Sequence, residues 1–187
     1  RNGTTDEEEE EEIIEEGELT DADIEAKDPT VVGPEMLRYS YDNKKNFSSS
    51  LTTKDEKNVV AIVPGGNDSG AVQIDGTTAV TADGGIISMK NYKYAVISYY
   101  FKTESAEAIK PSIKLLSIGI RGDEGAMGER TFTATEDLKA NEWATVKIRL
   151  SGTPSAYLTK GFILNPFGTT SSSSFAHGDT LYIESVT

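Results

Sequence analysis

A succession of short strand-like runs fills most of the chain and limits the folds open to it. The clearest run, residues 94–102, reads Tyr-Ala-Val-Ile-Ser-Tyr-Tyr-Phe-Lys and holds the aromatic and β-branched residues that strands favour. Further runs, bounded by Gly, Pro, Asp and Asn turn residues, span 37–41, 58–63, 70–74, 77–82, 112–121, 131–135, 145–150, 160–165 and 180–186. No long segment repeats its apolar residues every 3.6 positions. The pattern predicts an all-β sandwich or barrel.

Acidic residues are concentrated ahead of these runs. Residues 1–35 hold 15 of the 31 acidic side chains, two of the 18 basic ones and none of the aromatic ones. They therefore account for the whole net charge of −13, and residues 36–187 are neutral. Low hydrophobicity combined with high net charge disfavours packing. We expect a flexible acidic linker or leader over 1–35 and a single β-sandwich domain over 36–187.

Composition also bears on partners and chemistry. A neutral domain lacks the clustered Lys and Arg that bind phosphates, so nucleic acid is not an expected partner. No apolar run approaches the roughly 20 residues that span a bilayer, so membrane insertion is not expected. Cysteine is absent, which excludes disulfides, thiolate metal sites and a Cys nucleophile. Because the chain starts at Arg1 without Met, we expect a piece of a larger protein with covalently linked neighbouring domains.

Four segments resemble strands of a known family. Residues 37–43, Leu-Arg-Tyr-Ser-Tyr-Asp-Asn, resemble an opening strand in which an aromatic residue precedes acidic or amide residues. Residues 92–103 resemble a central strand with a Tyr-rich entry and a Lys-Thr exit, and residues 142–148, Glu-Trp-Ala-Thr-Val-Lys-Ile, also match. Residues 178–186, Gly-Asp-Thr-Leu-Tyr-Ile-Glu-Ser-Val, resemble the closing strand. Together they are similar to the galactose-binding-like jelly-roll group, which includes many carbohydrate-binding modules of bacterial glycan-degrading enzymes and surface proteins.

This resemblance implies an antiparallel β-sandwich of the jelly-roll type that binds a polysaccharide or oligosaccharide without catalysis. It implies an extracellular or cell-surface location. It also implies a structural calcium ion, for which Asp42 and Glu184 are the matching positions. Calcium takes six to eight oxygen ligands, and the first and last strands of a closed sandwich can lie side by side. The family often has two adjacent Asp residues where this chain has Glu184 and Ser185, and two solvated surface acids are the alternative.

Sugar binding requires aromatic faces that stack on the ring and polar side chains that bond its hydroxyls. Alternation along residues 95–102 assigns Ala95, Ile97, Tyr99 and Phe101 to the core and leaves Tyr100 on the opposite, amphipathic face. Similar alternation leaves Arg121 and Asn165 on less apolar faces. If those faces line up, Tyr100, Arg121 and Asn165 share a concave binding surface; otherwise they lie on an ordinary solvent-facing side.

A second possible site lies in the loops at one edge, with Tyr92, Tyr157 or Phe167 as stacking platforms. Trp143 directly precedes an alternating apolar run, and we expect it to pack in the core. His177 lies in a serine-rich loop without the Gly-x-Ser-x-Gly pattern of a nucleophile elbow, so no catalytic triad and no enzymatic activity are expected. The alternative to a carbohydrate-binding module is a structural or adhesive spacer, or a protein-recognition module, of a bacterial surface protein on the same fold.

Overall fold

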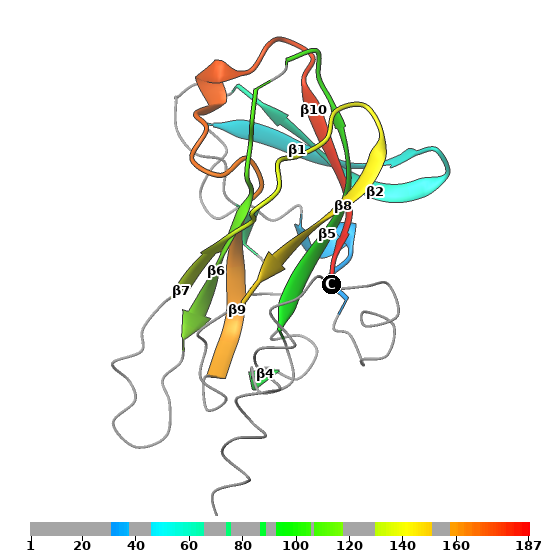
Figure 1. The fold of residues 1–187 in the computed structure, drawn as a ribbon. Coiled ribbons are helices and arrows are strands. Elements are labelled where there is room, and N and C mark those ends of the chain that lie inside the picture. The colour runs from blue at the N-terminus through cyan, green and yellow to red at the C-terminus, as the bar shows by residue number, and fades with distance from the viewer. Residues whose placement is uncertain are drawn as a thin grey trace, which may run out of the picture. The chain divides into compact units, whose positions relative to one another are not determined.

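A computed structural model describes residues 31–37, 46–65, 74–75, 87–88, 93–105, 107–117, 130–150 and 158–187 of the chain. Residues from Val31 to Thr187 belong to one compact unit (Figure 1). Its described helices are α3 (Pro34–Leu37) and the single 3₁₀ turn η3 (Ser172–Ser174). Within the described part of the chain, neither is a helix of the length and apolar character that a bilayer crossing requires.

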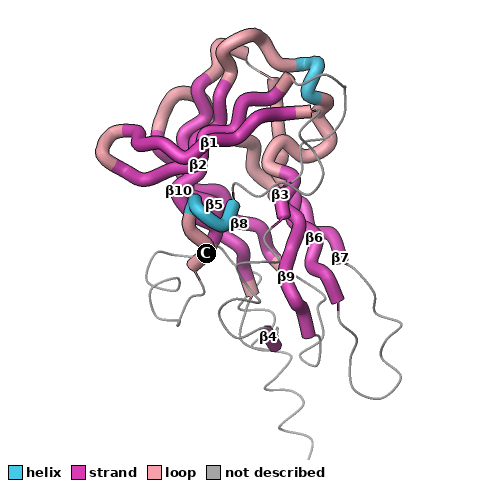
Figure 2. The backbone as a smooth tube through the Cα atoms, turned by 180° about the vertical axis from the view of Figure 1, so that it is seen from behind, coloured by secondary structure: helices cyan, strands magenta, loops and turns pink. Residues whose placement is uncertain are grey.

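The remaining elements are strands in two sheets, which Figure 2 shows from behind. Sheet A has the order β1-β2-β10-β5-β8, and sheet B has the order β3-β9-β6-β7, with β4 also pairing with β9. The strands are β1 (Phe47–Lys54), β2 (Lys57–Pro64), β3 (Ile74–Asp75), β4 (Ile87–Ser88), β5 (Tyr94–Lys102), β6 (Ser112–Ser117), β7 (Arg130–Thr133), β8 (Trp143–Arg149), β9 (Leu158–Asn165) and β10 (Thr180–Val186). All pairings between these strands are antiparallel.

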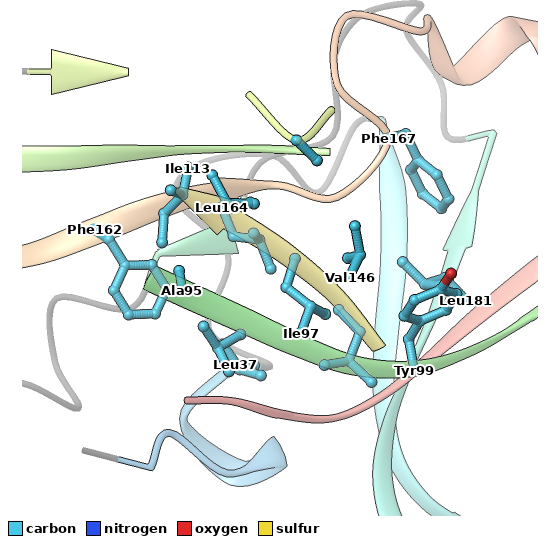
Figure 3. Close-up of a cluster of buried hydrophobic side chains, with 14 of the residues drawn as sticks. Leu37, Ala95, Ile97, Tyr99, Ile113, Val146, Phe162, Leu164, Phe167 and Leu181 are labelled. Atoms are coloured by element: carbon cyan, nitrogen blue, oxygen red, sulfur yellow. The ribbon is translucent and has the colours of Figure 1, made fainter. Parts of the chain in front are cut away.

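The two sheets enclose one hydrophobic core (Figure 3). Alternate residues of β5, including Ile97 and Tyr99, meet Ile113 and Leu164 of sheet B in this core, as alternation predicts. The chain changes sheet after β2, β4, β5, β7, β8 and β9, an alternation typical of jelly rolls. The antiparallel β-sandwich predicted from the sequence is therefore confirmed.

A buried hydroxyl group lies within this core. The Tyr99 side chain is buried, and its hydroxyl oxygen accepts a hydrogen bond of 2.8 Å from the backbone N–H of Lys139. Burial is the largest cause that raises the pKa of Tyr99 above 10.0; the Lys139 hydrogen bond lowers it, and the nearby Glu142 and Glu136 raise it further. The hydroxyl is thus held in its neutral form.

The first strands differ from the sequence prediction. Leu37 ends the short helix α3 instead of opening a strand, and residues 38–41 lie outside the described residues. Pro34 opens that helix, because its fixed φ suits the first helical turn. The strand β1 was not predicted, since Phe-Ser-Ser-Ser-Leu-Thr-Thr-Lys is mostly polar. Its polarity suits its position at the edge of sheet A, where most of its side chains are exposed.

The packed chain begins upstream of residue 36. Val32 and Val186 exchange backbone hydrogen bonds of 2.8 and 3.0 Å, and each residue is only 4% exposed. Val32 therefore extends sheet A beside the end of β10. The division into an acidic linker over 1–35 and a domain over 36–187 stays a prediction.

Candidate functional site

Three aromatic side chains meet on the outer face of sheet A. Tyr100 of β5 lies directly opposite Trp143 of β8 and Tyr182 of β10 in the strand registers. The ring centroid of Tyr100 is 5.6 Å from that of Trp143 and 6.3 Å from that of Tyr182, and both pairs are edge-to-face. Edge-to-face pairing of this kind stabilises aromatic neighbours beyond the burial of their area. All three side chains are half-buried, so each keeps some surface in solvent.

The tip of the β1–β2 hairpin lies against these rings. Its two turn residues, Asp55 and Glu56, have φ values of 52° and 67°, as a tight two-residue turn between twisted strands requires. The Lys54 ammonium is 4.2 Å from the centroid of the Tyr100 ring and 5.2 Å from that of Tyr182. The turn thus aims a cation at the aromatic faces, a geometry in which cation–π attraction operates.

The second lysine of the tip completes the arrangement. Lys57 Nζ is 5.4 Å from the centroid of the Trp143 ring and 3.8 Å from Glu184 Oε2. Glu184 Oε1 accepts a hydrogen bond of 3.1 Å from Ser98 Oγ. The register of β10 shifts between Ile183 and Ser185, so Glu184 is the extra residue of a bulge, a device that re-aims side chains.

The indole N–H of Trp143 donates a hydrogen bond of 2.9 Å to Asp55 Oδ2. This contact attaches the hairpin tip to β8, at the edge of the sheet. We call the resulting set of side chains the hairpin-tip cluster; it consists of Lys54, Asp55, Lys57, Tyr100, Trp143, Tyr182 and Glu184.

The ion pairs of the hairpin-tip cluster are weakly held. The side chains of Lys57 and Glu184 are 42% and 37% exposed, and the pair of Lys54 with Asp55 has a separation of 3.9 Å. Exposed pairs of this kind contribute about 0–1 kcal/mol to stability. The lysines can therefore exchange their carboxylate partners for groups on a ligand. Chemically, the cluster offers aromatic surface, ammonium donors and carboxylate acceptors side by side.

The predicted concave surface is wrong. Tyr100 points outward from sheet A, whereas Asn165 ends β9 in sheet B, on the side opposite the core residue Leu164. The outer faces of the two layers of a sandwich point away from each other, so these two residues do not share a surface. Leu115, which has the same strand parity as Arg121, is buried in the core. Arg121 itself lies outside the described residues.

The aromatic residues predicted as stacking platforms in the loops are Tyr92, Tyr157 and Phe167, and the structure describes only Phe167. Tyr92 and Tyr157 lie outside the described residues. Phe167 is fully buried, at 0% exposure, with its ring centroid 4.5 Å from that of Phe175 and 5.6 Å from that of Phe101. The prediction for Phe167 is wrong, because a ring enclosed by two others has no face to offer a sugar.

Trp143 is also placed differently from the prediction. It is half-buried on the outer face and is not a member of the core cluster. Along β8 the inward positions are taken by Ala144, Val146 and Ile148, with polar residues between them. The sequence could have predicted this outward position. Side chains alternate between the two faces of a strand, and Trp143 lies two and four residues before the outward Thr145 and Lys147.

The predicted calcium site is only partly described. Asp42 lies outside the described residues, and Glu184 faces the Lys57 ammonium and the Ser98 hydroxyl. Among the residues that the structure describes, no three His, Asp or Glu side chains are grouped in a way that could hold a metal ion. Glu184 alone is not a calcium shell, and a dication beside it would repel Lys57. The ion stays a prediction that depends on Asp42.

A groove of about 380 Å³ lies between α3 and the β1–β2 hairpin. Its lining consists of Gly33, Pro34, Glu35, Met36, Leu51, Thr52, Asn58 and Val59. The volume is within the range of small-ligand sites. The described residues of this lining include no aromatic ring and one ionisable group, Glu35, so they offer no stacking surface like that of the hairpin-tip cluster.

Comparison with known proteins identifies no family for the chain. No family model matches it. No curated protein matches it either. One solved structure resembles it, from a study of the promiscuous specificity of carbohydrate-binding modules of the β-sandwich superfamily. The likeness has a TM-score of 0.36 and 12% sequence identity, and it covers 83% of this chain and 62% of the other. The match thus spans less than two thirds of the solved chain.

Proposed function

We propose that the domain binds a polysaccharide or oligosaccharide without catalysis, through the hairpin-tip cluster. The observation that carries this proposal is the row of half-buried aromatic rings on three adjacent strands, flanked by charged side chains. Sugar rings present C–H surfaces that pack on aromatic side chains and hydroxyls that need donors and acceptors. Trp143 and Tyr182 supply the first, and Lys57 and Asp55 supply the second.

The dimensions of the row suit a chain of sugars. Neighbouring strands lie about 4.8 Å apart, so the row from β10 across β5 to β8 spans roughly 10 Å. More than one sugar ring fits along that length. Since the rings lie on the outer face of a sheet, a polysaccharide can approach them from its middle as well as from an end.

The family resemblance of the sequence supports a wider proposal. On that ground we assign the domain to the galactose-binding-like jelly-roll group, in an extracellular or cell-surface protein with covalently linked neighbouring domains. A structural calcium ion held by Asp42 and Glu184 belongs to the same proposal.

A structural or adhesive spacer is the second candidate, and one observation favours it. The contacts of the hairpin-tip cluster also explain how a hairpin tip is attached to a sheet, since Asp55 bonds Trp143 and Lys57 pairs with Glu184. A spacer would need this attachment and no ligand.

Binding measurements on variants separate the two candidates. The chain is tested against a panel of plant and microbial polysaccharides by affinity electrophoresis and calorimetry. Under the binding proposal, Trp143→Ala and Tyr182→Ala each weaken binding about tenfold, since each removes a stacking surface worth about 1.5 kcal/mol. Tyr94→Ala is the matched control, because Tyr94 lies at the far end of β5, roughly 20 Å from Tyr100. Absence of binding across the panel favours the spacer.

A further inference from the structure

The described strands of sheet A carry more basic than acidic side chains on the outer face that holds the neutral hairpin-tip cluster. The net charge of the whole chain is −13, yet the tip presents Lys54 and Lys57 directly at the aromatic row. Alternation along the strands adds Lys102, Lys147 and Arg149 to the same outer face of sheet A. Among the described strand residues of this face, Glu184 is the acidic one, and the turn adds Asp55 and Glu56.

The two lysine ammonium groups lie where a bound sugar would lie. The Lys54 ammonium occupies a position 4.2 Å from the centre of the Tyr100 ring. A neutral sugar that stacks on this face of Tyr100 has to displace the ammonium and gains no ionic contact in return. An acidic sugar keeps the ammonium as a binding partner while its ring packs against Tyr182 or Trp143. The arrangement therefore discriminates between neutral and charged ligands.

The present partners of the lysines indicate which anion fits. Lys54 is 3.9 Å from an Asp55 carboxylate oxygen, and Lys57 is 3.8 Å from a Glu184 carboxylate oxygen. Both distances are longer than the roughly 2.8 Å of a charge-assisted hydrogen bond. A carboxylate on a ligand can approach the same ammonium groups more closely than these tethered side chains do.

We infer, as a consequence that rests on the proposed function, that the ligand is an acidic polysaccharide whose sugars carry carboxylates. Its carboxylates bind Lys54 and Lys57, and its rings pack on the aromatic row. Two lysines are too few to bind a nucleic acid, which requires many phosphate contacts. They suffice for single uronic acid units. Repulsion from the acidic residues 1–35 is screened beyond about 8 Å at physiological ionic strength.

Matched polymers test the inference on the full chain. Polygalacturonate, alginate and hyaluronan are each compared with the same polymer after methyl esterification, which removes the charge and leaves the sugar backbone. At least one free acid should bind about tenfold or more tightly than its ester, and this preference should shrink as NaCl is raised from 0.05 to 0.5 M. Inference and proposal fail separately: equal binding of acid and ester, or absence of binding to all of these polymers, refutes the inference, whereas only absence of binding across the wider polysaccharide panel also refutes the proposed function.

Single lysine variants locate the effect. Lys54→Gln and Lys57→Gln should each reduce affinity for the preferred acid about tenfold and leave affinity for its ester unchanged. Lys139→Gln, at an exposed position beside the core residue Tyr99, makes the same change in net charge and should have no effect. If all three variants bind the acid alike, the inference is wrong. Equal melting midpoints confirm that the variants are folded.

Discussion

The indole N–H of Trp143 is bonded to the Asp55 carboxylate at 2.9 Å, although 88 positions separate the two residues. This bond attaches a two-residue hairpin turn to the strand at the far side of the same sheet. It also fixes the orientation of the single tryptophan of the chain. The Trp143 ring, which is the proposed stacking surface, and the turn between Lys54 and Lys57 are therefore held together.

Asp55→Ala should release the hairpin tip. The substitution removes the acceptor of the indole N–H, and we expect a loss of about 1 kcal/mol in the free energy of unfolding, the usual contribution of one hydrogen bond. Because Trp143 is the only tryptophan, its emission should shift to longer wavelength as water reaches the ring. Asp55→Asn keeps an acceptor oxygen and is the control. An unchanged emission maximum in Asp55→Ala would show that the bond is not maintained in solution.

Gly168→Ala should be strongly destabilising. Gly168 has a φ of +62°, and an added Cβ would lie 2.2 Å from the backbone oxygen of Lys110. Two backbone segments approach each other here, so neither can move aside as a flexible side chain would. We expect a loss of more than about 2 kcal/mol in urea unfolding.

The control for this variant is Gly33→Ala, because no atom of the described residues lies within 4 Å of a Cβ at Gly33 and its φ is not in the left-handed region. It should be neutral within about 0.5 kcal/mol. If both variants unfold at the wild-type urea concentration, the close approach of Gly168 to Lys110 is not a property of the folded protein.

The buried Tyr99 hydroxyl should make stability fall at high pH. Burial, chiefly, raises the pKa of Tyr99 in the folded protein above its ordinary value of 10.0. The unfolded chain loses this proton near pH 10, while the folded chain retains it to higher pH. The contribution of the neutral Tyr99 hydroxyl to the free energy of unfolding is thus fully present below pH 10. It is lost as the pH rises through the raised pKa of Tyr99 in the folded protein.

Urea unfolding between pH 9 and pH 11 measures this effect. Above pH 10, the wild type should lose stability more steeply than Tyr99→Phe, which has no hydroxyl to titrate. The other tyrosines and the lysines titrate in both proteins, so the difference in slope isolates Tyr99. Parallel slopes would mean that the hydroxyl is not withheld from water.

Calcium should raise the melting temperature if the ion is bound as the family resemblance implies. A ligand that binds only the native state stabilises it, by about 2.7 kcal/mol at a hundred times its dissociation constant. Melting curves are compared in excess calcium and in excess chelator, with Asp42→Asn as the variant. Since Glu184 already pairs with Lys57, Lys57→Gln should increase any calcium effect. Identical melting midpoints with and without the chelator would show that the folded protein does not bind calcium.

Strands rich in β-branched and aromatic residues could be predicted from the sequence, and the polar edge strand could not. The bounds of β5 and β10 agree with the predicted runs, because in both strands apolar residues alternate against a core. The strand β1 has only Phe47 and Leu51 as large apolar residues, and its pairing with β2 defines it instead. Pairing with a neighbour leaves no local signature in composition.

Alternation could place Tyr100 on an outward face, but it could not say which sheet Asn165 would join. That assignment depends on long-range pairing, in which β5 lies between β10 and β8 while β9 lies between β3 and β6. The role of the hairpin tip was hidden for a related reason. Asp55 and Glu56 form a left-handed turn without the glycine that marks most such turns.

Val32 and Val186 pair with each other, so the sandwich receives and releases its chain at neighbouring points of sheet A. A host protein with this domain inserted in a surface loop would need to separate the two ends of that loop only by the width of one strand pair, about 5 Å. Val32 and Val186 can equally be joined by a few residues and new ends opened elsewhere in the domain. The domain is therefore a suitable cassette for transplantation or circular permutation with the aromatic row kept whole.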